Sequence, residues 1–513
     1  MRRALAAGAA ALGLALGIAA PASAFCGFYV SGAGADLYNQ ATVVVLMRDG
    51  TRTVLSMRNA YEGPPEDFAM VVPVPVVLQE DNVKTLPEEV FARVDQLAAP
   101  RLVEYWEADP CTPPIPPPEP MPMAMAEAPM DAEADEGGSL GVTIEAQFEV
   151  GEYDIVILSA RDSSGLDTWL RREGYRIPEG AEPVLRPYVA QGTKFFVAKV
   201  DVERVTFRGG RALLSPLRVH YEAEAFALPI RLGLINSRGV QDLLVHVLAR
   251  GQRYEVANYG NVTIPTNILV NDSVRDSFGT FYNALFDRLL EENPGSVVTE
   301  YSWDASGCDP CPTPALDASE LATLGLDVVG GQPWGFVLSR LHFRYTAEQA
   351  SDDLVFRPAP PIVGGRGVPD QEGRLTREPR SAGQNAFQGR YVILHPWDGP
   401  VPCQSPIRGR WGGPPHGQER AAQPATDVAF AQRGESLGSF LDEDLPELEV
   451  RASPAEERLA RTEVEGEETV AVQTRDGGCA SCAVGAPARR PAGALALSAL
   501  VLAVLVLRRR RRR

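Results

Sequence analysis

The apolar and polar positions of the chain follow regular periods in several segments between residues 42 and 345. Two β-branched runs, Thr42–Met47 and Thr53–Met57, flank an Asp49-Gly50 pair that suits the positive dihedrals of a tight turn, so we expect a β-hairpin. Apolar residues recur every three or four positions from Val274 to Glu292, which predicts the longest helix. A period of two predicts a half-buried strand whose inward-facing residues are Ile144, Ala146, Phe148 and Val150.

Other apolar runs predict further strands and two shorter helices. Capping-box patterns at Thr85 to Glu88 and at Ser164 to Asp167 each begin a short helix. The strand expected at 68–76 contains prolines, which should place its end at a sheet edge or a bulge. Because hairpins and single helices mix without a regular strand–helix repeat, we expect an α+β fold with mixed, largely antiparallel sheets and room for two lobes. The further strands are expected at 68–76, 154–160, 194–202, 217–222, 242–249, 297–303 and 336–345.

Three segments interrupt these periods. Residues 109–138 are dense in proline, methionine, alanine and acidic side chains, so we expect a disordered insert. Residues 359–384 are interpreted as a loop insert, and residues 412–476 as an acidic, disordered tether. The folded domain is therefore expected to span residues 25–411 around the two inserts.

The N-terminus has the pattern of a secretory signal peptide. Two arginines precede an apolar stretch over residues 4–20, and small residues follow at Ala22-Ser23-Ala24. We expect signal peptidase to cut between Ala24 and Phe25, which would remove residues 1–24 and start the exported protein at Phe25.

The C-terminal residues 477–513 combine a motif containing Cys479 and Cys482, an apolar run from Ala492 to Leu507, and six terminal arginines. As a helix the run is about 24 Å long, shorter than the ~30 Å hydrocarbon core, but local thinning of the bilayer and snorkelling arginines would let it span. The arginines should stay in the cytoplasm and the bulk of the chain outside. We therefore expect this segment to engage the membrane, either permanently or during export.

Charge narrows the classes of partner. The chain holds 49 Lys and Arg against 67 Asp and Glu, a formal net charge of −18, and ten of the arginines lie in the two terminal segments. Nucleic-acid binding needs clustered Lys and Arg, so we expect no nucleic-acid partner. The Asp-x-Asp-x-Asp-Gly pattern of a calcium loop is absent from the sequence, and we expect neither a metal site nor a cofactor.

Cysteine offers more than one interpretation. If Cys308 and Cys311 form a local disulfide, three other cysteines compete for a second bridge, and the sequence does not decide among them. The Cys-x-x-Cys spacing also occurs in thioredoxin-like redox motifs and metal sites, but Pro312 and Pro314 prevent a helix from beginning there. We therefore favour a structural disulfide. The cysteines of the expected exported domain are Cys26, Cys111, Cys308, Cys311 and Cys403.

Histidine and serine patterns supply no catalytic residue. The five histidines are scattered, and His246 lies in an apolar run typical of a core position. His342 shares a strand face with Arg340 and Arg344, which could receive a carboxylate or phosphate, but a cross-strand ion-pair network fits the abundant Asp and Glu better. A Gly-x-Ser-x-Gly match at residues 434–438 lacks the apolar strand and helix that a nucleophile elbow needs.

Several short motifs follow one another along the chain: Cys26-Gly27-Phe28-Tyr29, Asn39-Gln40, Phe68-Ala69-Met70-Val71-Val72-Pro73-Val74-Pro75, Ala99-Pro100-Arg101-Leu102-Val103-Glu104-Tyr105, Gly151-Glu152-Tyr153-Asp154-Ile155, Leu228-Pro229-Ile230-Arg231-Leu232-Gly233, Cys308-Asp309-Pro310-Cys311 and Gly389-Arg390-Tyr391-Val392. Their order resembles the domain-of-unknown-function family numbered 2330. The resemblance implies one domain over most of residues 25–411, with no established activity and no catalytic residue to assign. The tail is similar to the myxobacterial C-terminal sorting signal (MYXO-CTERM), which implies that a dedicated protease cuts near Cys479 or Cys482 and leaves the protein on the cell surface.

These observations favour an exported protein with a non-catalytic surface, binding or structural role. Its expected location is the cell surface or outer membrane of a Gram-negative bacterium, and its expected partners are the membrane and the export and sorting machinery. One alternative hypothesis is an extracytoplasmic thiol-disulfide oxidoreductase that uses Cys308 and Cys311. Another is the binding of envelope polysaccharide through exposed aromatic residues such as Trp397 and Trp411.

Overall fold

The computed structural model describes residues 28–30, 38–39, 42–58, 61–62, 69–112, 142–173, 180–208, 211–236, 239–309, 311–366, 375–414, 423–424 and 431–441. These residues all belong to one compact unit, residues 1–459. The predictions for Ala24, Phe25 and Cys26, for most of the insert at 109–138 and for the whole of 477–513 fall outside the described residues.

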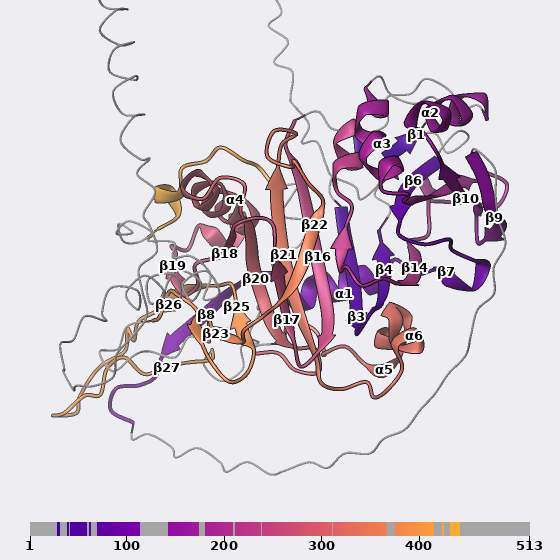
Figure 1. The fold of residues 1–513 in the computed structure, drawn as a ribbon. Coiled ribbons are helices and arrows are strands. Elements are labelled where there is room, and N and C mark those ends of the chain that lie inside the picture. The colour runs from indigo at the N-terminus through magenta and orange to yellow at the C-terminus, as the bar shows by residue number, and fades with distance from the viewer. Residues whose placement is uncertain are drawn as a thin grey trace, which may run out of the picture. The chain divides into compact units, whose positions relative to one another are not determined.

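The largest sheet has eleven strands, and its long central strands dominate the view in Figure 1. β18 (Asn261–Thr263) pairs with β20 beside the main path of this sheet. The order along the path is β24 (Arg380–Ser381), β23 (Ile362–Gly364), β25 (Ala386–Gln388), β20 (Val297–Asp304), β21 (Phe336–Tyr345), β16 (Gln241–Arg250), β3 (Thr42–Asp49), β4 (Arg52–Met57), β14 (Leu217–Glu222) and β7 (Val83–Thr85).

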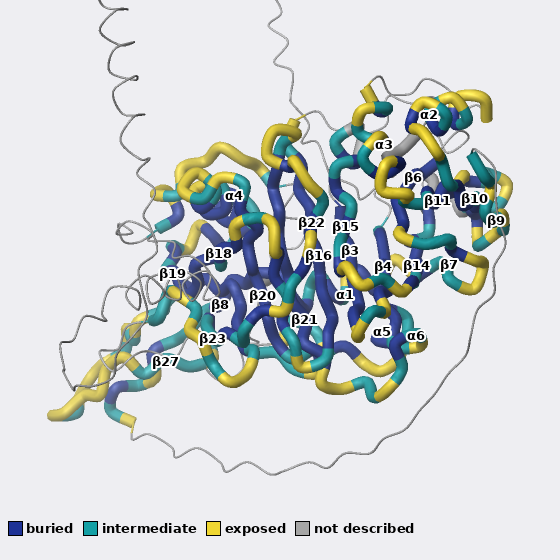
Figure 2. The backbone as a smooth tube through the Cα atoms, viewed as in Figure 1, coloured by how far each residue is buried: buried dark blue, intermediate teal, exposed yellow. Residues whose placement is uncertain are grey.

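The middle of this sheet is covered on both faces. All ten residues of β21 are buried, and Figure 2 shows the neighbouring strands as similarly enclosed. β21 pairs antiparallel with β16 and β20, whereas β16 pairs parallel with β3. Because side chains alternate along a strand, the even-numbered residues of β21 face α1 (Glu89–Ala98) and α4 (Val274–Glu292). The odd-numbered residues 341, 343 and 345 enter a separate apolar core.

A second sheet of five strands is wholly antiparallel. α2 (Ser163–Arg172) and α3 (Ala181–Ala190) cover one face, where Leu166 and Leu185 pack with Val197. The other face shares its apolar core with the largest sheet. The strand order is β1 (Phe28–Val30), β6 (Ala69–Val74), β11 (Lys194–Val200), β10 (Tyr153–Ala160) and β9 (Val142–Val150).

A third sheet joins distant parts of the chain. β8 (Arg101–Glu107) and β26 (Arg390–His395) lie side by side and parallel, and α4 packs on them through Phe281 and Tyr391. The remaining strands of this sheet are β19 (Ile268–Leu269), β27 (Trp411–Gly412) and β28 (Gln423–Pro424). A small three-stranded sheet has the order β15 (Ala227–Leu228), β22 (Leu354–Ala359) and β17 (Arg253–Val256). Two further sheets have two strands each, namely β12 (Thr206–Arg208) with β13 (Arg211–Leu213), and β2 (Tyr38–Asn39) with β5 (Tyr61–Glu62). The short helical turns are η2 (Glu80–Asn82), η3 (Arg231–Asn236), α5 (Ala318–Leu321), η4 (Ala322–Leu326), α6 (Asp327–Val329) and η6 (Leu437–Phe440).

These sheets confirm the α+β class with mixed, largely antiparallel pairing. The predicted hairpin forms between β3 and β4, and Gly50 adopts a φ of +54°, a conformation that glycine reaches without a steric penalty. The predicted helix over Val274–Glu292 forms with the same bounds, and so do the strands expected at 217–222 and 336–345.

Local details of three predicted elements differ. α1 forms, but its N-cap residue Glu88 makes no side-chain capping bond. α2 is capped by Asp162, whose Oδ1 accepts a hydrogen bond from the Gly165 amide at 2.6 Å, and not by Ser164. β9 forms at the edge of its sheet, where neighbours cover it only in part, so the predicted inward-facing Ile144 is 50% exposed.

Prolines explain two further features. β6 lies inside its sheet, but the described residues of β1 pair with residues 69–71 and not with Pro73, which is paired there with β11 alone. α3 was not predicted because Pro187 lies within it, where proline removes a helical hydrogen bond.

Part of the expected tether differs from an expanded chain. Residues 431–441 contain η6, and Phe440 is buried against Phe281 of α4. Leu441 also bridges to Val270. A few apolar side chains thus dock a stretch whose average composition is polar.

Candidate functional site

Two disulfides join four of the candidate cysteines. Cys111 bonds to Cys403, 292 residues later in the chain, and Cys308 bonds to Cys311. The first disulfide links the segments that follow the parallel strands β8 and β26. This is the pairing that the sequence left open, while Cys26, like Cys479 and Cys482, lies outside the described residues.

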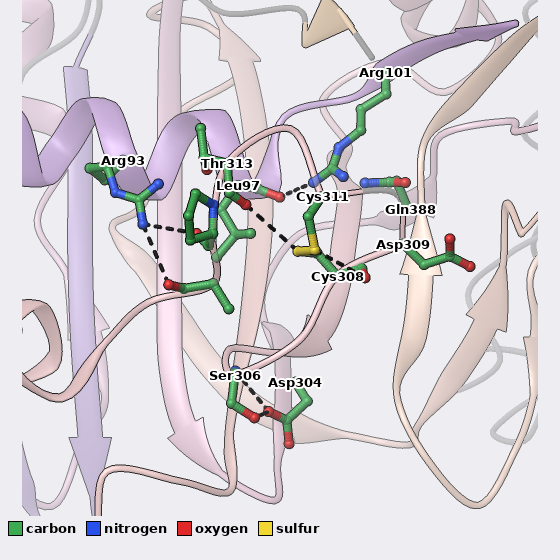
Figure 3. The surroundings of a disulfide bond; sticks show 12 residues. Arg93, Leu97, Arg101, Asp304, Ser306, Cys308, Asp309, Cys311, Thr313 and Gln388 are labelled. Carbon is green, nitrogen blue, oxygen red and sulfur yellow. Dashed lines mark hydrogen bonds between the residues drawn. A yellow bond between two sulfur atoms is a disulfide. The ribbon is translucent and has the colours of Figure 1, made fainter. Parts of the chain in front are cut away.

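The Cys308–Cys311 disulfide closes a short turn between β20 and α5 (Figure 3). Cys311 is exposed, whereas Cys308 packs partly buried against the apolar core beneath α1. α5 begins only at Ala318, after the capping residue Asp317, so neither cysteine lies at a helix N-terminus. A thiolate at this turn would therefore lack the helix N-terminus that stabilises the reactive cysteine of a thioredoxin-like site.

Basic side chains tie this turn to the rest of the fold. Arg390 of β26 donates from Nη2 to the Asp309 carbonyl, while the Asp309 carboxylate lies 3.5 Å from Arg366. On the other side, Arg93 of α1 pairs with Glu320 at 2.7 Å. Arg101 and Gln388 also surround the disulfide, as Figure 3 shows. The turn is thus held by Arg390 of β26, and the segment after it is held by Arg93 of α1.

The two tryptophans proposed for sugar binding both lie next to Glu107 at the end of β8. The Trp397 amide donates to Glu107 at 2.9 Å, and Trp411 pairs with Glu107 in the β8–β27 ladder. Burial acts to raise the pKa of Glu107, but the Trp397 and Gly409 amides and the Arg408 guanidinium hold it below its usual value. Both tryptophans are half-buried. Sugar binding by these residues stays a prediction.

A chain of charged side chains crosses the interior on the even-numbered face of β21. Arg340, His342 and Arg344 alternate along this strand, and their side chains are at most 4% exposed. The His342 ring stacks on Phe286 of α4, with 4.0 Å between ring centroids. Buried charges need partners, and each of these three side chains has a carboxylate beside it.

Glu300 of β20 is the central partner. One of its oxygens lies 2.6 Å from Arg340 Nε, the other 2.8 Å from His342 Nδ1, and the Tyr282 hydroxyl of α4 donates to it as well. A β-bulge between Thr299 and Tyr301 inserts Glu300 as the extra residue of β20. Bulges re-aim side chains, and this one turns Glu300 toward β21.

Asp242 of β16 and Asp287 of α4 complete the network. Asp242 accepts from His342 Nε2 and Arg344 Nε, both at 2.7 Å. Arg344 also reaches Asp287 at 2.5 Å, and Asp287 pairs with Arg433 at 2.8 Å. At the other end, Arg340 donates to Asp95 of α1. The network thus joins both helices to three strands, which confirms the predicted cross-strand ion pairs.

The carboxylates set the protonation of this network. Burial alone would raise the pKa of Glu300, but Arg340 and His342 outweigh it and hold the pKa at about 2. Burial would likewise raise the pKa of Asp242, yet Arg344 and His342 hold it well below its usual value. Burial lowers the pKa of His342, but Glu300 and Asp242 outweigh it, so that pKa lies above 6.5. Because a carboxylate faces each ring nitrogen, His342 donates from both as an imidazolium.

His246 differs from His342 although both are buried. Its Nε2 lies 3.9 Å from Asp95, and the pKa is lowered to about 3, first by burial and then by the nearby Arg340 charge. The ring is therefore neutral, as expected for a core histidine. Ser436 of the Gly-x-Ser-x-Gly match precedes the short helix η6 and follows no strand among residues 431–435, so the geometry of a nucleophile elbow is not formed.

A family of bacterial proteins, DUF2330, described as an uncharacterized protein conserved in bacteria, matches residues 20–357, more than half of the chain. The chain belongs to this family. No curated protein and no solved structure matches it.

The DUF2330 match contains most of the buried network. Asp95, Asp242, Glu300 and the three basic residues of β21 all lie inside it, as does the Cys308–Cys311 turn. The match ends within β22, whereas β26 and Cys403 follow it. The third sheet is therefore built from residues on both sides of the DUF2330 boundary.

We expect the contribution of His342 to stability to fall at alkaline pH. Its pKa is raised on folding, so its stabilising effect is complete below about pH 6.5 and is lost as the pH rises through the folded-state pKa. Urea unfolding of the wild type and of a His342→Gln variant, from about pH 5 to pH 9, measures this. The free-energy difference between the two should shrink as the pH rises.

At acidic pH the dependence is the opposite, because the stability that Glu300 and Asp242 contribute decreases as the pH falls. Glu300 and Asp242 have lowered pKa values, so their contribution is present above about pH 4.5 and is lost as the pH falls toward about 2.

For the alkaline range, a free-energy difference between wild type and His342→Gln that stays constant or grows toward pH 9 would show that His342 is not the buried cation of the network.

The described part of the chain contains neither a cluster of metal ligands nor a membrane-spanning helix. Among the described residues, no three His, Cys, Asp or Glu side chains gather as a metal-binding group. No described helix has the length and apolarity to cross a bilayer, and the predicted run at 492–507 is not among the residues described.

Proposed function

We propose that this DUF2330 protein is exported and held at the cell envelope, where its α+β body has a non-catalytic structural or binding role. The observation that carries the proposal is the Cys111–Cys403 disulfide, which joins segments 292 residues apart. Disulfides persist in oxidising compartments outside the cytoplasm. The signal-peptide pattern before Phe25 and the membrane-spanning pattern of the tail support the same destination.

The buried charges support a non-catalytic role for the body. Active sites pair shifted pKa values with access to a substrate, but Glu300 and Asp242, whose pKa values are lowered, and His342, whose pKa is raised, are enclosed between α1, α4 and the largest sheet. Each is engaged with an oppositely charged neighbour. Their arrangement accounts for the position of the helices on the sheet and leaves no carboxylate of this group for acid–base chemistry.

Cell fractionation tests the destination. The full chain should sediment with the envelope, whereas a chain ending at residue 476 should appear in a soluble extracytoplasmic fraction or in the medium, because it lacks the apolar run. A chain that keeps residues 477–507 and lacks only the six arginines is the matched control for the apolar run. Envelope retention of the chain ending at 476, or recovery of the full chain in the cytoplasm, would contradict the proposal.

A thiol-disulfide oxidoreductase is the second candidate. Two observations favour it: Cys311 is exposed, and the Arg390 guanidinium contacts the turn at the Asp309 carbonyl. A nearby cation stabilises a thiolate. Such an enzyme would hold part of its Cys308–Cys311 pair reduced in the cell, whereas a structural disulfide would stay oxidised, so the redox state of this pair separates the two functions.

A further inference from the structure

Four polar side chains converge beside the Cys308–Cys311 turn, where the largest sheet meets the third sheet. Tyr301 of β20 pairs with Gln388 of β25, and Arg390 of β26 pairs with Arg101 of β8. Gln388 and Arg390 are two residues apart and in contact, with 3.1 Å between Gln388 Oε1 and Arg390 Nη2. Because directly paired residues share a face, as do residues two apart, all four side chains lie on one face of this junction.

Three donors of this cluster have no hydrogen-bond partner among the described residues. They are the Tyr301 hydroxyl, Gln388 Nε2 and Arg390 Nε, and each belongs to a residue that is at most 1% exposed. Buried polar groups are almost always hydrogen-bonded, and exceptions need an explanation. All three groups can donate, so an acceptor that the described residues do not supply would satisfy them together.

Charge points to the same missing partner. The Arg390 guanidinium meets only neutral acceptors among the described residues: the Tyr105 hydroxyl at 2.9 Å, the Gln388 amide oxygen and the Asp309 carbonyl. Arg101 is buried nearby and donates to the Leu97 carbonyl at the end of α1. Its pKa is lowered to about 10, first by burial and also by the Arg390 charge. A buried guanidinium group that meets only neutral acceptors among the described residues, as that of Arg390 does, calls for a negative charge nearby.

The two carboxylates whose charges act on this cluster, those of Asp309 and Asp304, have hydrogen-bond or ion-pair partners elsewhere. Asp309 lies 3.5 Å from Arg366, and its side chain is 44% exposed. Asp304, which acts on Tyr301, accepts a hydrogen bond from the Ser306 amide at 2.8 Å. Neither carboxylate accepts a hydrogen bond from the three unsatisfied donors.

We propose that Tyr301, Gln388, Arg390 and Arg101 form a binding site for one small monovalent anion, either chloride or a single carboxylate group. Such an anion accepts hydrogen bonds from the three free donors and offsets the charge of the Arg390 guanidinium group. All four residues are at most 1% exposed, so the site admits only a small anion.

Thermal unfolding of the full chain in different sodium salts tests the site. Sodium chloride, sodium formate and sodium phosphate are each titrated at constant ionic strength, with sodium gluconate as the balancing salt. Chloride or formate should raise the unfolding temperature with a saturable dependence, because binding to the native state alone stabilises it. No anion-dependent shift, or a saturable response to phosphate alone, would overturn the proposal.

A pair of tyrosine variants places the effect at this cluster. Tyr301→Phe removes one donor and should raise the half-saturating anion concentration at least tenfold, whereas in gluconate alone the variant should be no less stable than the wild type. Tyr391→Phe is the matched control, because its hydroxyl is also buried without a partner among the described residues but belongs to the core of α4 on the opposite face. Equal titrations of the two variants would place the anion elsewhere and overturn the assignment.

Discussion

Replacing Glu300 with glutamine is expected to destabilise the protein by about 3–5 kcal/mol, the usual loss when one partner of a buried ion pair is removed. Glu300 accepts from Tyr282 and lies against both Arg340 and His342, and all four side chains are buried. Glutamine keeps the shape of the side chain, so the loss reports charge and hydrogen bonding and not a cavity. Among the described residues, Arg340 would then keep Asp95 as its one carboxylate partner.

Urea unfolding measures this loss, with an exposed ion pair as the control. Glu222→Gln breaks a 3.1 Å pair with Arg52 whose side chains are 49% and 65% exposed, and such pairs contribute about 0–1 kcal/mol. The two substitutions make the same chemical change in strands of the same sheet. A Glu300→Gln cost no larger than that of Glu222→Gln would mean that the network does not hold α1 and α4 to the sheet.

Removal of the two disulfides is expected to have unequal effects. The double variant Cys111→Ser, Cys403→Ser opens a loop of 292 residues and should lose about 4–5 kcal/mol, since the entropy of loop closure grows with loop length. The double variant Cys308→Ser, Cys311→Ser opens a separation of three residues and should lose about 2 kcal/mol or less.

Unfolding of both double variants, with the wild type measured with and without reductant, checks this order. The reduced wild type should match the sum of the two losses, because the disulfides share no atoms and close separate loops. An equal or larger cost at the Cys308–Cys311 turn would show that this short disulfide supports the structure around it more than the long-range one does.

Much of the secondary structure could be predicted from the sequence, but little of the tertiary arrangement could. Period and turn chemistry were sufficient for the β3–β4 hairpin and α4, because those signals are local. They could not predict that β8 pairs with β26, almost 290 residues later, since parallel pairing leaves no mark on neighbouring residues. α3 was not predicted because Pro187 within it argues against a helix, although its apolar face packs onto the second sheet.

The buried network shows the same limit at a finer scale. The face shared by Arg340, His342 and Arg344 was predicted from a period of two, but their partners were not. Glu300 and Asp242 each lie in an apolar strand, and a lone carboxylate in such a run was the available signal. The β-bulge that presents Glu300 arises from pairing between distant strands, so no local pattern indicates it.

Peptide mass spectrometry on protein from native cell envelopes, alkylated before and after reduction, tests the central claim of an exported, disulfide-stabilised and non-catalytic protein. We predict fully oxidised Cys111–Cys403 and Cys308–Cys311 pairs, an N-terminus at Phe25, and a C-terminus near Cys479 to Cys482. A chain that still begins at Met1, with free thiols at Cys111 and Cys403, would contradict export. A partly reduced Cys308–Cys311 pair would contradict the non-catalytic role and favour the oxidoreductase.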